Sequence, residues 1–244
     1  MNDEMTFVLT SCGRPKLLNK SLDSFFKYNK FNFKKMYIVE DSINNDVYSE
    51  IKSKWDNKID IILNKTKKGQ IKSIIDTYKL IDTPYIFHCE DDWIYTRSNF
   101  IEDSLEILKS DKKIIQVWLE SKESASRLDI FNYDKEKEVN GIKFSRVNCK
   151  EGWEWGFFSF RPGVKRLYDY KLIGGYKNFK NELDISVKYR DLGYHTVIFD
   201  KPAAVDIGDD YHVDDPTRKW PKRRKSNAAR GLKRLWGHIK KMKF

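Results

Sequence analysis

Three consecutive acidic residues, Glu90, Asp91 and Asp92, end the apolar run at 84–89. An apolar run of this length before a polar cluster is typical of a buried strand, so the three carboxylates are expected at its tip. In open α/β sheets, ligands bind at the carboxyl ends of the strands. Neighbouring carboxylates repel one another, and a bound divalent cation relieves that repulsion. The triplet therefore predicts a cation site that can hold a diphosphate; a solvated acidic turn is the alternative.

Alternating strand and helix patterns surround this triplet. Apolar runs predict strands at 6–10, 35–39, 59–63 and 84–89, and helical spacing of apolar residues predicts helices at 16–28, 46–55 and 70–80. This alternation predicts a parallel sheet, and right-handed crossovers bring the turns after its strands to one edge. Arg14, Asp41, Lys68 and the acids at 90–92 are therefore expected to share one cleft.

The second half of the chain is less regular. Helices are predicted at 98–110 and 181–192, and strands at 114–118 and 196–199. Residues 119–140 are polar and are predicted to form a loop or an excursion from the main fold. Aromatic residues are dense at 151–161, where Trp153 and Trp155 point to one side if the segment is extended.

Composition and charge narrow the protein class. The chain has 244 residues, of which 40% are apolar and 14% aromatic, as in a folded protein. Neither a transmembrane run nor a signal peptide is recognised, and three cysteines without metal-type spacing indicate reduced thiols, so a cytoplasmic protein is expected. The net charge of +11 arises in residues 217–244, which hold twelve Lys or Arg and no acid. We expect one domain at 1–216, with halves at 1–95 and 96–216, and a separate basic tail.

The basic tail has a helical pattern of its own. Ser226 is suited to cap the helix, and its apolar residues fall on one stripe, with Lys and Arg elsewhere. The stripe consists of Leu232, Leu235, Trp236, Ile239 and Met242. A basic amphipathic helix of this kind favours an anionic membrane surface. The alternatives are a helix docked on the body of the protein and a nucleic-acid-binding tail.

Four segments in order resemble one enzyme family. They are 10–15 (TSCGRP), 39–42 (VEDS), 68–70 (KGQ) and 85–92 (YIFHCEDD). The series resembles the nucleotide-sugar-binding half of family 2 glycosyltransferases, over roughly 5–212. The resemblance implies a GT-A fold, which is an α/β, Rossmann-like and mostly parallel central sheet flanked by helices, here followed by the basic C-terminal helical extension.

The resemblance also implies roles for the residues near the acids. Asp92, with Glu90, would bind Mn²⁺ or Mg²⁺, and Asp91 would hold the ribose or the waters of the metal. Asp41 would accept a hydrogen bond from the nucleobase; a turn or cap acid is the alternative. His212 would complete the metal site, or would be an ordinary loop histidine.

Cations and aromatic residues complete the implied substrate site. Arg14 and Lys68 would face phosphate or base, with surface cations as the alternative. Arg161 would lie near the diphosphate or the acceptor. Trp153 and Trp155 would stack on the acceptor sugar, although plain core packing would explain them equally well.

The late segment 181–194 (NELDISVKYRDLGY) resembles the helix that carries the catalytic base of the family. The base falls on Glu182, and Asp184 is the second candidate because Asn181 replaces the first acid of the motif. The alternative is an amphipathic helix with surface acids. A positioned base of this kind contributes about 10²–10⁴-fold to the rate.

These implications together predict a metal-dependent, inverting hexosyltransferase that uses a nucleotide sugar, with a UDP-sugar as the first expectation. The acceptor would be a glycan or lipid-linked hydroxyl, and the enzyme would be peripheral at the inner membrane face. The rival functions are a sugar nucleotidyltransferase and a nucleic-acid-binding protein that uses the tail. The nucleotidyltransferase is disfavoured because Gly13 is the single glycine of the first turn. Nucleic-acid binding by the tail would leave the acids at 90–92 unexplained, so no nucleic acid is expected.

Overall fold

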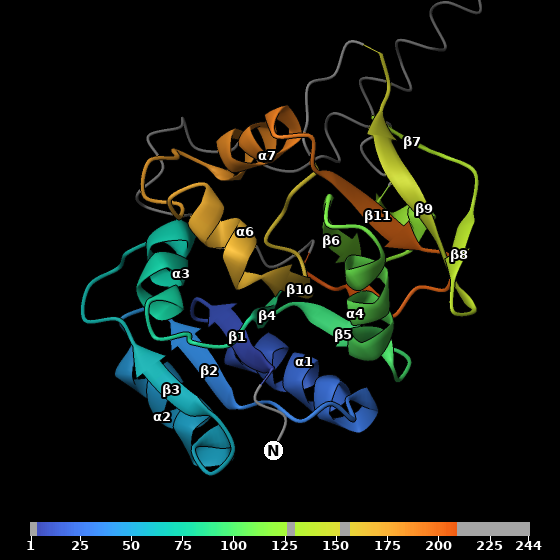
Figure 1. Cartoon of the computed structure of the whole chain (residues 1–244). Helices are drawn as coiled ribbons and strands as arrows, with labels where there is room; N and C mark the ends of the chain where they lie inside the picture. The colour runs from blue at the N-terminus through green and yellow to red at the C-terminus, as the bar shows by residue number, and fades with distance from the viewer. Residues whose placement is uncertain (1–3, 126–129, 152–156, 209–244) are drawn as a thin grey trace, which may run out of the picture. The chain divides into compact units, whose positions relative to one another are not determined.

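The computed structural model describes residues 4–125, 130–151 and 157–208 (Figure 1). Contacts divide the chain into two units, Met1–Asp214 and Asp215–Phe244, and all described residues belong to the first. Trp153, Trp155, His212 and the predicted tail helix at 217–244 lie outside the described residues.

A five-stranded sheet forms the first half, in the order β10-β4-β1-β2-β3 (Figure 1). Four of its strands are parallel: β1 (Met5–Ser11), β2 (Lys35–Glu40), β3 (Asp60–Leu63) and β4 (Tyr85–Glu90). The fifth, β10 (Gly163–Arg166), pairs antiparallel with β4. The sheet confirms the four predicted strands. β1 and β4 are mostly buried because both faces of the sheet are covered at its centre, whereas β3 at the edge is only partly buried.

Helices cover both faces of this sheet. The helices that connect successive parallel strands are α1 (Pro15–Tyr28), α2 (Asn45–Trp55) and α3 (Gln70–Tyr78). Phe7 and Phe87 pack with α1, α2 and α4 (Phe100–Ser110) in one buried cluster. Val8 and Ile86 pack with α3, α6 (Leu167–Leu172) and α7 (Glu182–Asp191) in a second cluster on the opposite face. The alternation of β1 side chains thus separates two core layers.

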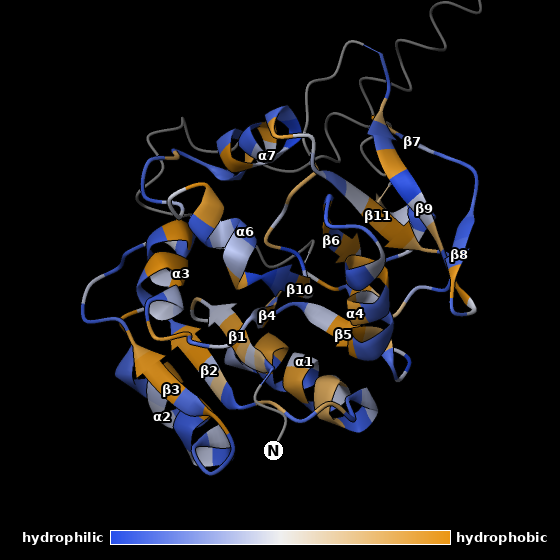
Figure 2. Cartoon of the chain, in the orientation of Figure 1, coloured by the Kyte–Doolittle hydropathy of each residue, from blue (hydrophilic) through white to orange (hydrophobic). Residues whose placement is uncertain are grey.

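A second sheet joins the later strands. Its order is β6 (Ile114–Trp118), β11 (His195–Phe199), β9 (Ile142–Cys149) and β7 (Phe131–Tyr133), with β8 (Lys137–Val139) also paired to β9. The segment at 119–140, predicted as a loop or excursion, contains α5 (Lys122–Ala125), β7 and β8. These strands have three residues each, which is too short for a periodic signal, and Figure 2 shows that β8 is hydrophilic where β3 is mostly hydrophobic.

A two-stranded ribbon follows the acidic triplet. β5 (Trp93–Tyr95) pairs antiparallel with β12 (Ala204–Asp206), so that Trp93 lies opposite Asp206. The ribbon brings the end of the described chain back to the tip of β4. Among the described residues, no helix has both the length and the apolar character needed to cross a membrane.

Candidate active site

The turn after β4 is anchored by Asp91. This carboxylate is fully buried, and it accepts hydrogen bonds from Ser11 Oγ at 2.9 Å and from Arg14 Nε at 3.2 Å. A second Arg14 nitrogen bonds its other oxygen. These contacts arise because β1 and β4 are parallel neighbours, with Thr10 opposite Glu90, so the turn after β1 lies beside the acids. Burial raises the pKa of Asp91 to about 6, and Arg14 partly opposes that shift.

Arg14 also reaches the next acid, with Nη1 3.0 Å from Asp92 Oδ2. Burial raises the pKa of Asp92; Arg14 opposes this effect and Asp206 adds to it. Glu90 accepts a hydrogen bond from Gln70 Nε2 at 2.7 Å. Burial, and then repulsion from Asp92 and Glu182, raises the pKa of Glu90 to about 8. Burial and mutual repulsion therefore disfavour the ionised form of these carboxylates, and Arg14 offsets only part of that effect.

The segment after β12 packs against Asp92. The Ile207 amide donates to the Asp92 carbonyl at 2.8 Å, and the Gly208 amide donates to Asp206 Oδ1 at 2.8 Å. A Cβ atom at Gly208 would collide with the Asp92 carboxylate. Only glycine therefore fits this approach without displacing the acid.

The turn after β2 is organised by two acids. Asp41 accepts hydrogen bonds from Asn64 Nδ2 at 2.7 Å and from the Lys68 and Gly69 amides at 2.8 Å. Glu40 accepts from the Gly13 and Ser42 amides, each at 2.8 Å. Asp41 thus shapes the loop that enters α3, and Glu40 ties the turns after β1 and β2 together.

The Lys68 side chain lies apart from the acids. Its Nζ pairs with Asp76 Oδ2 on α3 at 2.8 Å. Its backbone amide, in contrast, binds Asp41, so the residue contributes to the predicted cleft through its main chain.

Helix α7 supplies Glu182 at its first position. The Asn181 side chain caps the helix by accepting a hydrogen bond from the Asp184 amide at 3.0 Å. Glu182 Oε2 accepts a hydrogen bond from the Phe160 amide at 2.8 Å. Repulsion from Glu182 is also one of the causes that raise the pKa of Glu90, after burial and Asp92.

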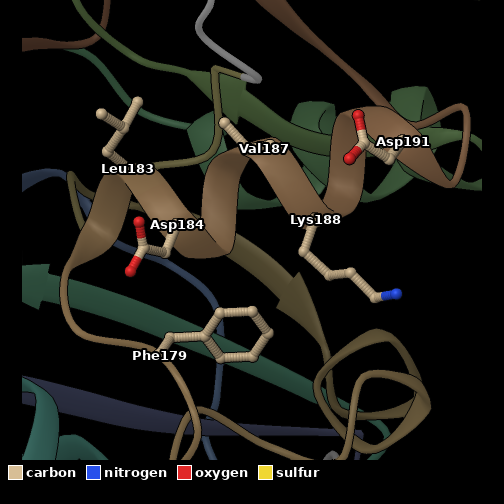
Figure 3. Close-up of a pocket in the computed structure, with 6 residues that line it drawn as sticks. All are labelled: Phe179, Leu183, Asp184, Val187, Lys188 and Asp191. Carbon is tan, nitrogen blue, oxygen red and sulfur yellow. The ribbon is translucent and has the colours of Figure 1, made fainter.

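Asp184 has different surroundings. It accepts a hydrogen bond from the Lys180 amide at 3.2 Å and lines a shallow hollow of about 520 Å³ beside α7 (Figure 3). The hollow is formed by Phe179, Leu183, Asp184, Val187, Lys188 and Asp191. Of the two predicted base residues, the structure brings Glu182 close to Glu90 and places Asp184 at this hollow.

Arg161 forms a second charged group beyond β6. Its guanidinium pairs with Glu120 and lies 4.8 Å from the centre of the Trp118 ring. Burial raises the pKa of Glu120, Arg161 opposes the shift, and Asp206 adds to it. Asp206 raises the pKa of both Glu120 and Asp92, so it acts on the Arg161–Glu120 pair and on the acidic edge alike.

Several residues of this region gave no signal in the sequence. Glu120, Lys165 and Asp206 take part in its contacts only because distant strands meet. Ser11 belongs to the segment 10–15 that resembles the family, but its hydrogen bond to Asp91 depends on the pairing of β1 with β4. Gln70 was part of a quoted segment, as the first residue of a predicted helix, but its bond to Glu90 depends on the tertiary fold.

Solved structures share this architecture. One is a mannosyltransferase from Pyrobaculum calidifontis in complex with GDP-Man and Mn²⁺. The structural match covers 82% of this chain and 56% of the mannosyltransferase chain, with 10% sequence identity and a TM-score of 0.57. Another is S. aureus TarS, for which the match covers 82% of this chain and 59% of the TarS chain at 14% sequence identity. The TM-score is 0.55 for one TarS structure and 0.56 for the structure in complex with UDP. No protein-family model matches the sequence, and the curated proteins include no significant match.

These likenesses confirm the predicted GT-A fold, with its mostly parallel α/β sheet. The chain spans less than two thirds of the length of the solved chains that it matches.

Proposed function

We propose that this protein is a glycosyltransferase that moves a sugar from a nucleotide-sugar donor to an acceptor hydroxyl. The observation that carries the proposal is the convergence of Glu90 and Asp92, at the tip of β4, with Glu182 at the start of α7. Similar folds have been solved with GDP-Man and Mn²⁺ and with UDP, which supports a nucleotide-sugar donor.

The acidic edge suits a divalent cation. Glu90 and Asp92 carry oxygen donors, and burial followed by repulsion from Asp92 raises the pKa of Glu90 to about 8. Carboxylate oxygens favour Mg²⁺ or Mn²⁺. We propose Asp92 and Glu90 as the protein ligands, with His212 as a further one. When bound, such a cation would offset negative charge on the leaving diphosphate.

The turns after β1 and β2 would hold the donor. Asp41 positions the Lys68 and Gly69 amides, so we propose that this loop receives the nucleobase, with a UDP-sugar as the first expectation. Arg14 would face the diphosphate from its place beside Asp92. The buried Asp91 would act by fixing Arg14 and, with it, the ribose side of the site.

Glu182 would act as the base. It would take the proton of the acceptor hydroxyl while that oxygen forms a bond to the anomeric carbon. The bond from that carbon to the diphosphate oxygen breaks in the same step, and the electron pair leaves with the nucleotide. A single displacement of this kind inverts the anomeric centre. Asp184 is the second candidate for this role.

The acceptor would approach from the side of Arg161. Trp153 and Trp155 precede this residue in the chain, and we propose that they stack on a glycan or lipid-linked acceptor. Residues 217–244 would bring the enzyme to an anionic membrane surface through their cations, each of which contributes about 1 kcal/mol near such a surface.

A thermal-shift screen tests the donor and the cation together. UDP, GDP and their sugars are added with and without Mn²⁺ to wild-type protein, to Asp92→Asn and to a control, Asp60→Asn, which alters an exposed acid on β3. A ligand at 100 times its Kd stabilises the native state by about 2.7 kcal/mol. We expect a metal-dependent shift in wild type and control but not in Asp92→Asn. No shift with any nucleotide would contradict the proposal.

A further inference from the structure

Lys165 is a buried cation in the middle of β10. Its exposed fraction is 4%. β10 pairs with β4 so that Lys165 lies opposite Ile86 and Gly163 lies opposite His88. Because strand side chains alternate, Ile86, His88 and Glu90 share one face of β4. Lys165 therefore belongs to the same sheet face as Glu90, in the core layer that α7 covers.

The Lys165 side chain runs along β10 toward the acidic edge. Its Nζ donates a hydrogen bond to the Arg161 carbonyl at 3.2 Å. To reach that oxygen it passes Gly163, which contributes no side chain and packs so closely on β6 that a Cβ would lie 3.0 Å from the Val117 carbonyl. The Phe158 ring lies 5.7 Å from Nζ, so much of the surroundings are apolar.

Two carboxylates offset the charge of this ammonium group. The strongest attraction acting on Lys165 comes from Glu182 and the next from Glu90. A buried charge is costly unless opposite charges compensate it. Glu182 and Glu90 repel each other, so a cation near both stabilises their close approach.

Lys165 and Glu182 also hold the same piece of backbone. Glu182 accepts a hydrogen bond from the Phe160 amide, and Lys165 donates to the carbonyl of Arg161. Gln116 binds this segment at two further points, the Ser159 amide at 3.2 Å and the Arg161 carbonyl at 3.1 Å. Side chains thus fix the segment that leads from the aromatic stretch at 151–156 into β10.

From these contacts we infer that Lys165 is a positioning residue for sugar transfer. Its ammonium group holds Glu182 and the segment at 158–161 in place. It also compensates the negative charges of Glu182 and Glu90 from within the core layer under α7. The inference rests on the proposed function. Lys165 acts through Glu182, and its burial keeps it out of the substrate site. A purely structural lysine, in contrast, would serve only to satisfy the Arg161 carbonyl.

The test is a double-mutant cycle in the full-length chain. Lys165→Met removes the charge at similar length, and Lys165→Gln keeps a hydrogen-bond donor without the charge, in case the methionine variant does not fold. Both are combined with Glu182→Gln. Lys171→Met, on the exposed side of α6, is the matched control. Unfolding in urea, UDP affinity with Mn²⁺ and the kcat and KM of transfer are measured for each variant.

We expect kcat to fall about 10- to 100-fold in both Lys165 variants, as for a misplaced catalytic group. UDP affinity should stay within about 2-fold, and adding either Lys165 change to Glu182→Gln should lower kcat little further. Independent, multiplicative losses of kcat, or an unchanged kcat, would overturn the inference.

The stability arm separates this inference from the proposed function. The free energies of unfolding of the single and double variants should not add, because the two charges interact in the native state. Additivity in an enzyme that transfers sugar would overturn the role of Lys165 alone. A wild-type protein that neither binds a nucleotide nor transfers sugar would overturn the proposed function, and the positioning role with it, even if the coupling persisted.

Discussion

The carboxylate of Glu182 accepts a hydrogen bond from the backbone amide of Phe160 at 2.8 Å. This contact joins the first residue of α7 to the segment that leads into β10. It leaves the side chain little freedom to turn away from Glu90, whose pKa it raises. A base needs such fixed geometry, because a small misplacement of the acceptor oxygen lowers the rate strongly.

The first prediction concerns this carboxylate. Glu182→Gln preserves side-chain length and an oxygen that can accept from Phe160, but it removes the proposed base. We expect kcat to fall by about 10²–10⁴-fold while the midpoint of thermal unfolding changes little. Transfer assays with the best donor from the thermal-shift screen measure the effect. Asp184→Asn, at the neighbouring hollow, is the control and should retain most activity; the reverse pattern would assign the base to Asp184.

The second prediction concerns Arg14. Arg14→Met leaves the fully buried Asp91 without its cation, and breaking a buried ion pair from one side costs about 3–5 kcal/mol. We expect a lower free energy of unfolding in urea and weaker UDP binding. Adding Asp91→Asn should restore part of the stability, because the uncompensated charge is gone. Full stability of Arg14→Met would show that Ser11 alone suffices to hold Asp91.

The third prediction concerns the close approach at Gly208. Gly208→Ala places a methyl group against the Asp92 carboxylate, which must then move. We expect a weaker Mn²⁺-dependent thermal shift, while the first sheet stays folded by circular dichroism. Val205→Ala, at an exposed position of the same ribbon, is the control. An undiminished Mn²⁺ response in Gly208→Ala would exclude a role for this approach in cation binding.

The fourth prediction is a pH dependence of stability. Burial lowers the pKa of Lys165 from 10.5 to about 8 in the native state. Between these values the unfolded chain binds more protons, so the free energy of unfolding should rise with pH, by about 3 kcal/mol at most. Urea unfolding of wild type and Lys165→Met at pH 8, 9 and 10 isolates the effect, since the variant lacks this group. Parallel curves for the two proteins would contradict the prediction.

The sequence predicted the first sheet well because of its parallel topology. β1 is buried along its whole length, so it is a continuous apolar run, and the apolar face of α1 indicated the following helix. The ribbon of β5 and β12 was missed, since three residues carry no usable period and their pairing joins distant segments. Helix α7 (Glu182–Asp191) was predicted at 181–192, which is within one residue at each end.

The candidate site was predictable only where local pattern and topology agree. Arg14 and the acids were expected in one cleft, and the structure brings them into contact. The Lys68 side chain instead pairs with Asp76, a choice among nearby carboxylates that spacing alone does not decide. Lys165, between Val164 and Arg166, has the pattern of a surface residue, and only the pairing of β10 with β4 buries it.

The ribbon that braces Asp92 has a consequence for the order in which the protein is made. β1 to β4 can pair as soon as residue 90 has emerged, but the contacts of Asp92 with Ile207 and Gly208 come from the far end of the domain. Domains form from the N-terminus during synthesis, and contacts distant in sequence form late. We therefore expect a ribosome-bound fragment that ends before residue 204 to have a folded sheet with an unfinished acidic turn. If the protein transfers sugar as proposed, its acidic edge would then be completed only after residue 208 has emerged.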